Sequence, residues 1–420
     1  MPYREQIPID RGIDNSLSMM MEGYLYITNR RRRFGRDMFE TRLLGAQKAV
    51  CIAGEEAAKL FYDETKIMRK GAAPKRVRQT LFGEKAIQTM DDVNHKHRKA
   101  LFMSLMTEDR LQEIVDIFKE EWSSAIEQWE SKEQIVLYSE VTKVLTAAVC
   151  RWAGVFLPEN DLNLRASQLE AMFDAAAAVG PRHWKGRQGR NALEQWLKNM
   201  IEEFRSGKLE IPEETAMHQI AWYRDTNGNV LDSQVAAVEV LNILRPTVAI
   251  AVYIVFTALA VFEHPSEKIK LKQENGETYY EMFVQEVRRY YPFFPFAAAR
   301  ARKDFLWKGH DFKKGNLVLL DIYGTNHHPD LWEKPNQFYP EHFQDRENNP
   351  FDFIPQGGGE YKLGHRCPGE WLTIEVMKAS LDMLMNHMEY EVPEQDLDYS
   401  MSRMPSLPKS RIIMKRIKKI

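Results

Sequence analysis

One cysteine in a glycine-rich loop is the residue best placed for chemistry in this chain. Cys367 lies in the segment Phe353-Ile-Pro-Gln-Gly-Gly-Gly-Glu-Tyr-Lys-Leu-Gly-His-Arg-Cys-Pro-Gly-Glu-Trp-Leu. Apolar residues then recur at helical spacing, at Leu372, Val376, Ala379 and Met383. At the start of a helix, unpaired N–H groups and the helix dipole stabilise the thiolate form of a cysteine over the thiol. Gly369 has no side chain, so the backbone there could approach the sulfur closely. The loop predicts a metal-binding thiolate, with a buried structural cysteine as the alternative.

Arg245 and Pro246 form a second unusual feature, because they precede the most apolar stretch of the chain, residues 246–262. A buried guanidinium keeps its charge and is costly without a counter-ion, so Arg245 needs an anionic partner. Pro246 has no N–H for the carbonyl of Asn242 and should open the helix there. The alternatives are a structural Arg–Glu pair within the protein and a helix that begins at Pro246.

A third candidate is the basic segment Asn94-His-Lys-His-Arg-Lys, which begins a predicted helix. His95 and Arg98 are three residues apart and face the same side of a helix, where they could converge on carboxylates. An exposed basic turn is the alternative interpretation. A zinc site from His95 and His97 is disfavoured, because residues two apart diverge on a helix.

The elements that must position these residues are mainly helical. Apolar stripes at helical spacing run through residues 111–129 and 193–204, and a long central helix is expected around residues 246–262. Strand patterns are few: Val50-Cys-Ile near the start, and a hairpin over residues 311–323 that turns at Lys314-Gly315-Asn316. Residues 326–343 are rich in turns and aromatic side chains, which predicts an ordered irregular segment. The fold class expected is mainly α with a small β-rich lobe.

Composition describes an ordinary globular protein. The chain has 420 residues, is 44% hydrophobic and 28% charged, and has a formal net charge of −2. This balance argues against nucleic acid as the main partner. No linker or low-complexity run divides the chain, so we expect a single domain over residues 1–420. The run of arginines at 30–33 is expected to be a solvated face.

The number and spacing of the cysteines, together with residues 1–10, indicate the cellular compartment of the protein. Cys51, Cys150 and Cys367 are far apart, which fits a reducing cytoplasm better than a disulfide framework, and the first two are expected in the core. Residues 1–10 lack the basic-then-apolar pattern of an export signal. The apolar run 246–262 is too short, and too close to polar residues, to favour a membrane span. We therefore expect a cytoplasmic protein without a membrane span.

Four features in this order resemble the cytochrome P450 family. They are Glu286-Val-Arg-Arg289, the predicted hairpin, Pro340-Glu-His-Phe343 and the Cys367 loop. The resemblance implies the cytochrome P450 fold and haem b (iron protoporphyrin IX), with Cys367 as the axial ligand of the iron. It also implies that His95 and Arg98 bind the haem propionates. Two departures are His342, where the family usually has an arginine that joins a buried Glu–Arg pair, and His365, where most members have an arginine.

The segment around Arg245 resembles one branch of that family. Ordinary P450 monooxygenases have an acid before the threonine at this point, whereas this chain has Arg245 and Pro246 before Thr247. The arrangement resembles the bacterial fatty-acid peroxygenases, which include hydroxylases and alkene-forming decarboxylases. Further matches to this branch are Leu81-Phe82-Gly83, Gln88, residues 98–106, Arg288-Arg-Tyr-Tyr-Pro-Phe293 and Ile354-Pro-Gln-Gly-Gly-Gly359.

By resemblance, the chain is expected to be a haem-thiolate oxidoreductase that uses hydrogen peroxide to hydroxylate long-chain fatty acids at the α or β carbon, without an obligatory redox partner. Arg245, Pro246 and Gln88 are the expected catalytic residues, and Phe82, Phe293 and Phe294 are expected to line the alkyl chain together with Arg245. Gln88 stands where decarboxylating members tend to have histidine, so alkene should be a minor product. The alternatives are a redox-partner-driven monooxygenase, a fatty-acid decarboxylase, and a haem-based sensor without turnover.

Overall fold

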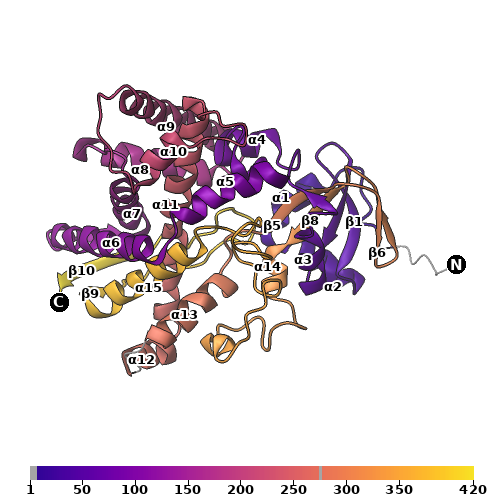
Figure 1. Cartoon of the computed structure of the whole chain (residues 1–420). Helices are drawn as coiled ribbons and strands as arrows, with labels where there is room; N and C mark the ends of the chain where they lie inside the picture. The colour runs from indigo at the N-terminus through magenta and orange to yellow at the C-terminus, as the bar shows by residue number, and fades with distance from the viewer. Residues whose placement is uncertain (1–6, 274–276) are drawn as a thin grey trace.

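The computed structural model describes residues 7–273 and 277–420, so most of the N-terminal segment considered for an export signal lies outside the described residues. A large helical part lies beside a smaller lobe of strands, as Figure 1 shows, which confirms the predicted fold class.

The helices are α1 (Ser16–Glu22), α2 (Tyr26–Phe34), α3 (Glu55–Phe61), α4 (Lys75–Val77), α5 (Asp92–Ser104), α6 (Glu108–Trp129), α7 (Leu137–Ala153), α8 (Leu162–Asp174), α9 (Pro181–Arg205), α10 (Ala216–Trp222), α11 (Ser233–Glu263), α12 (Pro265–Gln273), α13 (Glu277–Tyr290), α14 (Ile322–Asn326) and α15 (Glu370–Asn386). The strands are β1 (Met38–Leu43), β2 (Gln47–Ile52), β3 (Ile67–Met68), β4 (Gln134–Val136), β5 (Phe296–Ala301), β6 (Phe305–Trp307), β7 (His310–Phe312), β8 (Leu317–Asp321), β9 (Met388–Glu391) and β10 (Ile413–Lys419).

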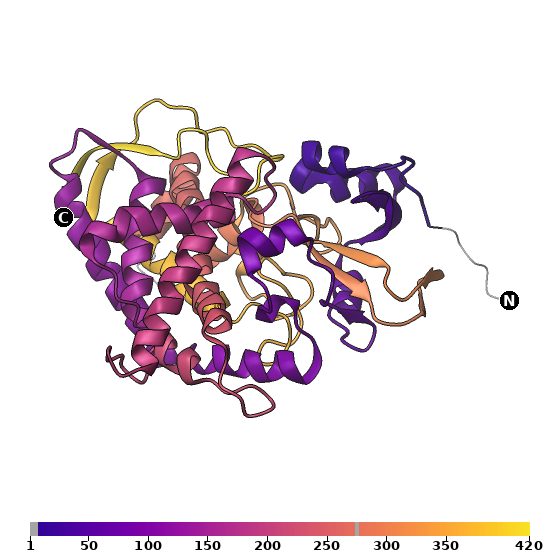
Figure 2. The same cartoon turned by 90° about the horizontal axis from the view of Figure 1, so that it is seen from above.

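Helix α11 runs through the centre of the helical part, and α7, α9 and α15 pack around it (Figure 2). Its first turn is capped by Asp232, whose side chain accepts a hydrogen bond from the N–H of Gln234. The helix is continuous through Pro246, so the alternative that it begins at Pro246 is wrong. It is long and apolar enough to cross a membrane, but 94% of its most apolar window is buried inside the protein, as expected of a core helix.

The two predicted apolar stripes are confirmed as core faces of α6 and α9. In α6 the buried residues are Ile114, Ile117, Phe118, Trp122, Ile126 and Trp129. In α9 the buried residues include Leu193, Leu197, Met200 and Ile201. Cys150 is buried in the same core as these side chains, as the sequence predicted.

A five-stranded sheet in the order β1-β2-β8-β5-β3 forms the smaller lobe. Strands β2 and β8 are parallel, and the other neighbours are antiparallel. Because side chains alternate along a strand, Val50 and Ile52 pack on one face with residues of α3, while Ala49 and Cys51 pack on the other with residues of α2. The predicted strand at residues 50–52 and the burial of Cys51 are confirmed.

The hairpin predicted over residues 311–323 is wrong. A turn does form where it was expected, since the N–H of Asn316 donates to the carbonyl of Lys313. The strands on its two sides belong to different sheets, however: β7 pairs with β6, and β8 pairs with β2 and β5. The hairpin that exists is β6–β7, whose turn residues Lys308 and Gly309 both have positive φ, at 45° and 78°.

The arginine run at 30–33 is a second correction. Arg30 and Arg31 are buried rather than solvated, and each has a carboxylate partner. Arg30 Nε lies 2.9 Å from Asp10 Oδ2, and Arg31 Nε lies 2.8 Å from Asp37 Oδ1. A run of like charges does not show which of its side chains the fold buries against neighbouring acids.

A buried charge network fixes the irregular segment after α14. Glu286 and Arg289 are both fully buried and lie 2.6 Å apart, and Arg289 also donates to the carbonyls of Asn326, Pro335 and Gln337. His342 Nδ1 lies 3.2 Å from Glu286 Oε2, so the imidazole occupies the third place in this network. The network holds residues 326–343 in an ordered path without regular strands, as predicted.

Replacing Arg289 by methionine tests this network. The Arg289→Met variant leaves the carboxylate of Glu286 buried without its cationic partner, so its free energy of unfolding should fall by about 3–5 kcal/mol in denaturant titrations. The control is Arg416→Met, which removes an exposed pair with Glu391 and should cost no more than about 1 kcal/mol. Equal stability of the two variants would contradict the role assigned to the Glu286–Arg289 pair.

Candidate active site

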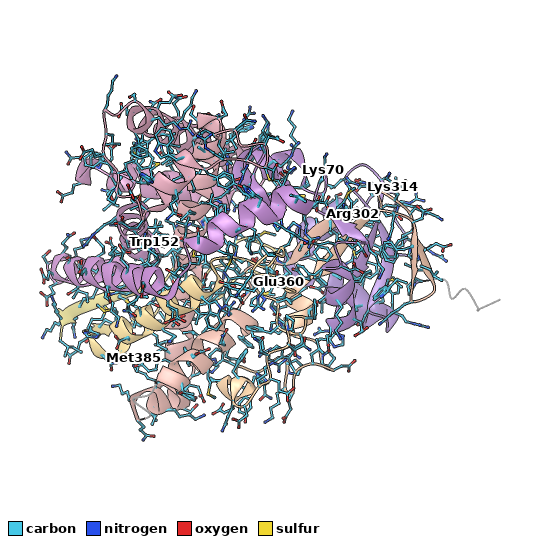
Figure 3. All side chains as sticks on the ribbon, in the orientation of Figure 1. Lys70, Trp152, Arg302, Lys314, Glu360 and Met385 are labelled. Carbon is cyan, nitrogen blue, oxygen red and sulfur yellow. The ribbon has the colours of Figure 1, made fainter. Side chains whose placement is uncertain are left out.

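A cavity of about 350 Å³ lies where α11 faces the Cys367 loop. Eight of the nine residues predicted for the site line it: Phe82, Gln88, His95, Arg245, Pro246, Phe293, Phe294 and Cys367. Arg98 is the exception. Glu360, which begins the turn leading to Cys367, is labelled in Figure 3 near the junction of the helical part and the sheet lobe. The fold therefore brings together side chains that are separated by most of the sequence.

Glycines shape the loop that carries Cys367. Gly357 and Gly359 have φ of 94° and 82°, in the left-handed region where glycine is favoured. A Cβ at Gly358 would lie 2.5 Å from the carbonyl oxygen of Pro350 and 2.7 Å from a methyl carbon of Ile354. The loop then closes on itself, because the N–H of Cys367 donates to the carbonyl of Gln356 at 3.1 Å. Backbone conformation and close packing thus explain the three consecutive glycines.

The environment of Cys367 differs in one respect from the sequence expectation. Burial raises the pKa of its thiol, while Lys99, the N–H of Gly369 and Arg288 oppose that rise. The position before a helix therefore does not produce a thiolate by itself, since desolvation has the larger effect. A coordinated metal would supply the missing stabilisation, because metal binding deprotonates a thiol. A Cβ at Gly369 would meet no described atom within 4 Å, so its predicted steric role is not supported.

Arg245 is a buried cation for which the described residues supply no counter-ion. Its side chain is 6% exposed, its Nε has no hydrogen-bond partner, and no described carboxylate forms an ion pair with it. Burial, and next the nearby cation of Arg190, lower the pKa of Arg245 to about 9, while Cys367 opposes this shift. The guanidinium remains charged at neutral pH. It is therefore a cation in the wall of the cavity that is available to pair with an anionic ligand.

The alternative of a structural Arg–Glu pair is wrong for Arg245. The nearest acid before it on α11 is Glu239, which is completely buried. Glu239 pairs with Arg98 of α5 and also accepts hydrogen bonds from the N–H of Ile87, at 3.1 Å, and from the amide of Asn242, at 3.1 Å. The carboxylate of Glu239 is thus occupied by partners other than Arg245.

The same contacts correct the role predicted for Arg98. The guanidinium is tied to Glu239 and does not line the cavity, so it is not placed to bind haem propionates. The cavity has a basic rim instead, formed by Arg69, His95, Lys99, His365 and Arg366. Sequence analysis missed Arg69 and Lys99, although the basic segment that contains Lys99 was noticed. The rim supplies the donors that two propionates need.

His95 and His365 stack on each other within this rim, with ring centroids 3.8 Å apart. Burial, and next the neighbouring His365, lower the pKa of His95 to about 3, and its Nδ1 has no partner. His97 instead contacts the hydroxyl of Tyr223, so a zinc site from His95 and His97 does not form. In the tautomer that has its proton on Nδ1, His95 can donate a hydrogen bond from this unpartnered nitrogen to a bound propionate.

These observations fit haem. Cys367, the residues of the basic rim, and Arg245 and Pro246 of α11 all line the same cavity. Phe293 stacks on Tyr253 at 4.2 Å, and Phe294 meets Phe293 edge to face at 5.1 Å, so the aromatic wall is rigid. Phe173, Met404 and Pro405 also line the cavity. Sequence analysis missed them because only the tertiary fold brings these distant segments together.

Comparisons with known proteins agree with this geometry. The family model described as cytochrome P450 matches residues 260–416. The chain is 44% identical to cytochrome P450EX alpha, solved with myristic acid, over 99% of this chain and 100% of that one, with a TM-score of 0.96. It is 44% identical to cytochrome P450SP alpha, solved with (R)-ibuprophen, over 97% and 99%, with a TM-score of 0.95. It is 38% identical to ligand-free cytochrome P450 OleT over 99% of both chains, with a TM-score of 0.96.

The unpaired state of Arg245 has a consequence for stability. Arg245→Leu removes a buried charge without a protein partner, so in the absence of ligands the variant should be about 1–3 kcal/mol more stable than the natural protein. Arg190→Leu is the matched control, because Arg190 is equally buried but pairs with Glu194 at 2.5 Å and donates to the carbonyl of Leu81. That variant should be less stable. A destabilised Arg245→Leu protein would mean that Arg245 has a structural partner.

Proposed function

This chain belongs to the cytochrome P450 family, in the CYP152 branch with P450EX alpha, P450SP alpha and OleT, and from that membership we propose that it is a fatty-acid peroxygenase. The reaction is hydroxylation of a long-chain fatty acid at its α or β carbon by hydrogen peroxide. One observation carries the proposal: a buried guanidinium without a protein counter-ion, Arg245, lies in the same cavity as the Cys367 sulfur. The net reaction converts the C–H bond and H₂O₂ into C–OH and one water.

The haem b of this family would be held by Cys367 and by the basic rim. Haem with a thiolate ligand activates peroxide for insertion of an oxygen atom into a C–H bond. Cys367 would bind the iron through its sulfur, and His95, with Arg69, Lys99 and His365, would bind the propionates. Gln356 would tune the ligand, since its amide nitrogen lies 3.9 Å from the sulfur.

Arg245 binds the substrate carboxylate and thereby selects the carbon that reacts. A guanidinium and a carboxylate form a charge-assisted, bidentate pair, which gains strength where water is excluded. With the carboxylate fixed on α11, the first carbons of the chain are the ones that lie between α11 and Cys367. Phe82, Phe293 and Phe294 then hold the following methylenes. Fixing one end of the substrate explains oxidation near the carboxylate.

The anchored carboxylate also supplies the acid–base group that this cavity lacks. Thr247 follows Arg245 and Pro246, and its hydroxyl donates to the carbonyl of Ile243 at 2.9 Å, within its own helix. No acidic side chain is among the residues that line the cavity. The substrate carboxylate, held beside the site where peroxide reacts, can accept and return the peroxide proton. This argues against the alternative of a monooxygenase that relies on a protein acid and threonine.

The partners follow from the same arrangement. A long-chain fatty acid and hydrogen peroxide suffice, and no obligatory redox partner is needed. Within residues 7–273 and 277–420, α11 is the one helix long and apolar enough to cross a membrane, and its burial in the core supports a soluble protein. A cytoplasmic location accords with three free cysteines, of which Cys51 and Cys150 are buried.

Product analysis tests the function. Purified haem-loaded protein with myristate and hydrogen peroxide, and no reductase, should yield 2- or 3-hydroxymyristate by mass spectrometry. Arg245→Leu should lose most myristate binding, by about 100-fold in Kd, together with turnover, because a desolvated charge pair is lost. Arg416→Met, at an exposed position of β10, should behave like the natural protein. Turnover that requires a reductase and O₂ would favour the monooxygenase, and no turnover under either condition would favour the sensor.

The identity of residue 88 leads to a prediction of whether hydroxy acid or 1-alkene is the main product. Its carboxamide lines the cavity and cannot exchange a proton near neutral pH, whereas an imidazole can. The natural protein should therefore form mainly hydroxy acids, since loss of CO₂ requires a second oxidation of the substrate. Gln88→His should raise the ratio of 1-alkene to hydroxy acid, measured by mass spectrometry after reaction with peroxide. Alkene as the main product of the natural protein would instead identify a decarboxylase.

A further inference from the structure

Asn242 presents an unused hydrogen-bond acceptor to the cavity, one helical turn before Arg245. Its side chain is 5% exposed and lines the cavity. Its Nδ2 donates to Glu239 Oε2 at 3.1 Å, which fixes the orientation of the amide. The other amide atom, Oδ1, is buried and has no partner among the described residues. A buried polar atom without a partner is costly, so the site is expected to receive a donor from a ligand.

A second acceptor belongs to the same residue. In a continuous helix the carbonyl of Asn242 would accept from the N–H of residue 246, but Pro246 has no N–H to give. The backbone carbonyl and the side-chain oxygen of Asn242 therefore both lack an intrahelical donor. Residues three apart lie on the same side of a helix, which places these acceptors beside Arg245.

A substrate carboxylate cannot supply the hydrogen-bond donor that the two oxygen atoms of Asn242 need. An ionised carboxylate has acceptors only, so it binds Arg245 and is repelled by the oxygens of Asn242. The ligand that Asn242 needs has an O–H donor. It must also fit beside a carboxylate that already occupies the guanidinium. Hydrogen peroxide has two O–H donors and is small enough to meet both requirements.

We propose that Asn242 is the residue that binds hydrogen peroxide next to the anchored carboxylate, and that Glu239 is the positioning residue that turns the Asn242 amide toward the cavity. This inference rests on the proposed peroxygenase function. Glu239 also accepts from the backbone N–H of Ile87, the neighbour of Gln88, so one buried carboxylate holds both the Asn242 amide and the backbone next to Gln88. Its partner Arg98 neutralises the charge that would otherwise repel the substrate.

The geometry predicts a selective effect on peroxide. Asn242→Leu keeps the approximate size of the side chain but removes its acceptor, so KM for hydrogen peroxide should rise about fivefold to tenfold, as expected for one hydrogen bond. The Kd for myristate, measured by calorimetry, should change less than twofold. Asn199→Leu is the matched control, because Asn199 lies exposed on α9 and bonds to Gln195. It should change neither constant.

Two further measurements keep the test decisive. If Asn242→Leu does not fold, Asn242→Ser keeps an O–H donor for Glu239 on a shorter side chain, so no side-chain oxygen reaches the position of Asn242 Oδ1 and the same rise in KM for peroxide is expected. A crystal structure of the haem-loaded protein with myristate should show an ordered oxygen atom within hydrogen-bond distance of Asn242 Oδ1. That oxygen should be absent from the Asn242→Leu crystal.

The results also distinguish hydrogen peroxide from the hydroxyl of the product as the O–H donor to Asn242. An unchanged KM for peroxide in both variants overturns the proposal. So does a selective loss of affinity for 2-hydroxymyristate over myristate with KM for peroxide unchanged, since Asn242 would then bind the product hydroxyl. Absence of peroxide-driven product from the natural protein overturns the proposed function itself, and this result is seen before any variant is compared.

Discussion

The central constraint in this structure is a positive charge held inside an apolar helix without a counter-ion from the described residues. Arg245 lies in α11, whose other side chains form the middle of the core, and the one nearby acid, Glu239, is occupied by Arg98, Ile87 and Asn242. Such an arrangement lowers stability, and its retention is understandable only if a ligand supplies the anion. Binding of that anion also explains the other features of the cavity.

The two sides of the cavity perform different tasks because they belong to different elements. The Cys367 loop is held by glycine conformations and by the packing of Gly358, so the sulfur has a fixed position. Helix α11 offers a cation and unpaired acceptors, and its Pro246 prevents the helix from satisfying its own carbonyl. A fatty acid and peroxide would complete the hydrogen bonding of α11, and the carboxylate would take the place of a protein acid. Substrate binding and proton transfer thereby become the same interaction.

Much of this could be predicted from local sequence, and the failures share one cause. Helical periodicity identified α6, α9 and α11, and the glycine-rich loop identified Cys367, because both patterns depend on near neighbours. Eight of nine proposed site residues line the cavity. Arg98 was misplaced because its partner Glu239 is 141 residues away. Arg30 and Arg31 were misplaced because a run of like charges does not show which of its side chains the tertiary fold buries against acids such as Asp10 and Asp37. The hairpin at residues 311–323 failed because a turn signal does not specify which strands pair.

The account depends on the carboxylate acting as part of the catalytic machinery, and chemical rescue tests that point most directly. The haem-loaded natural protein is given hydrogen peroxide and a neutral aromatic co-substrate, with and without a short carboxylic acid that occupies Arg245 but leaves the outer cavity open. The account predicts that oxidation of the neutral substrate is slow alone and is strongly increased by the acid. Equal rates with and without the acid would show that the protein supplies its own acid–base group, which would contradict the role given to Arg245.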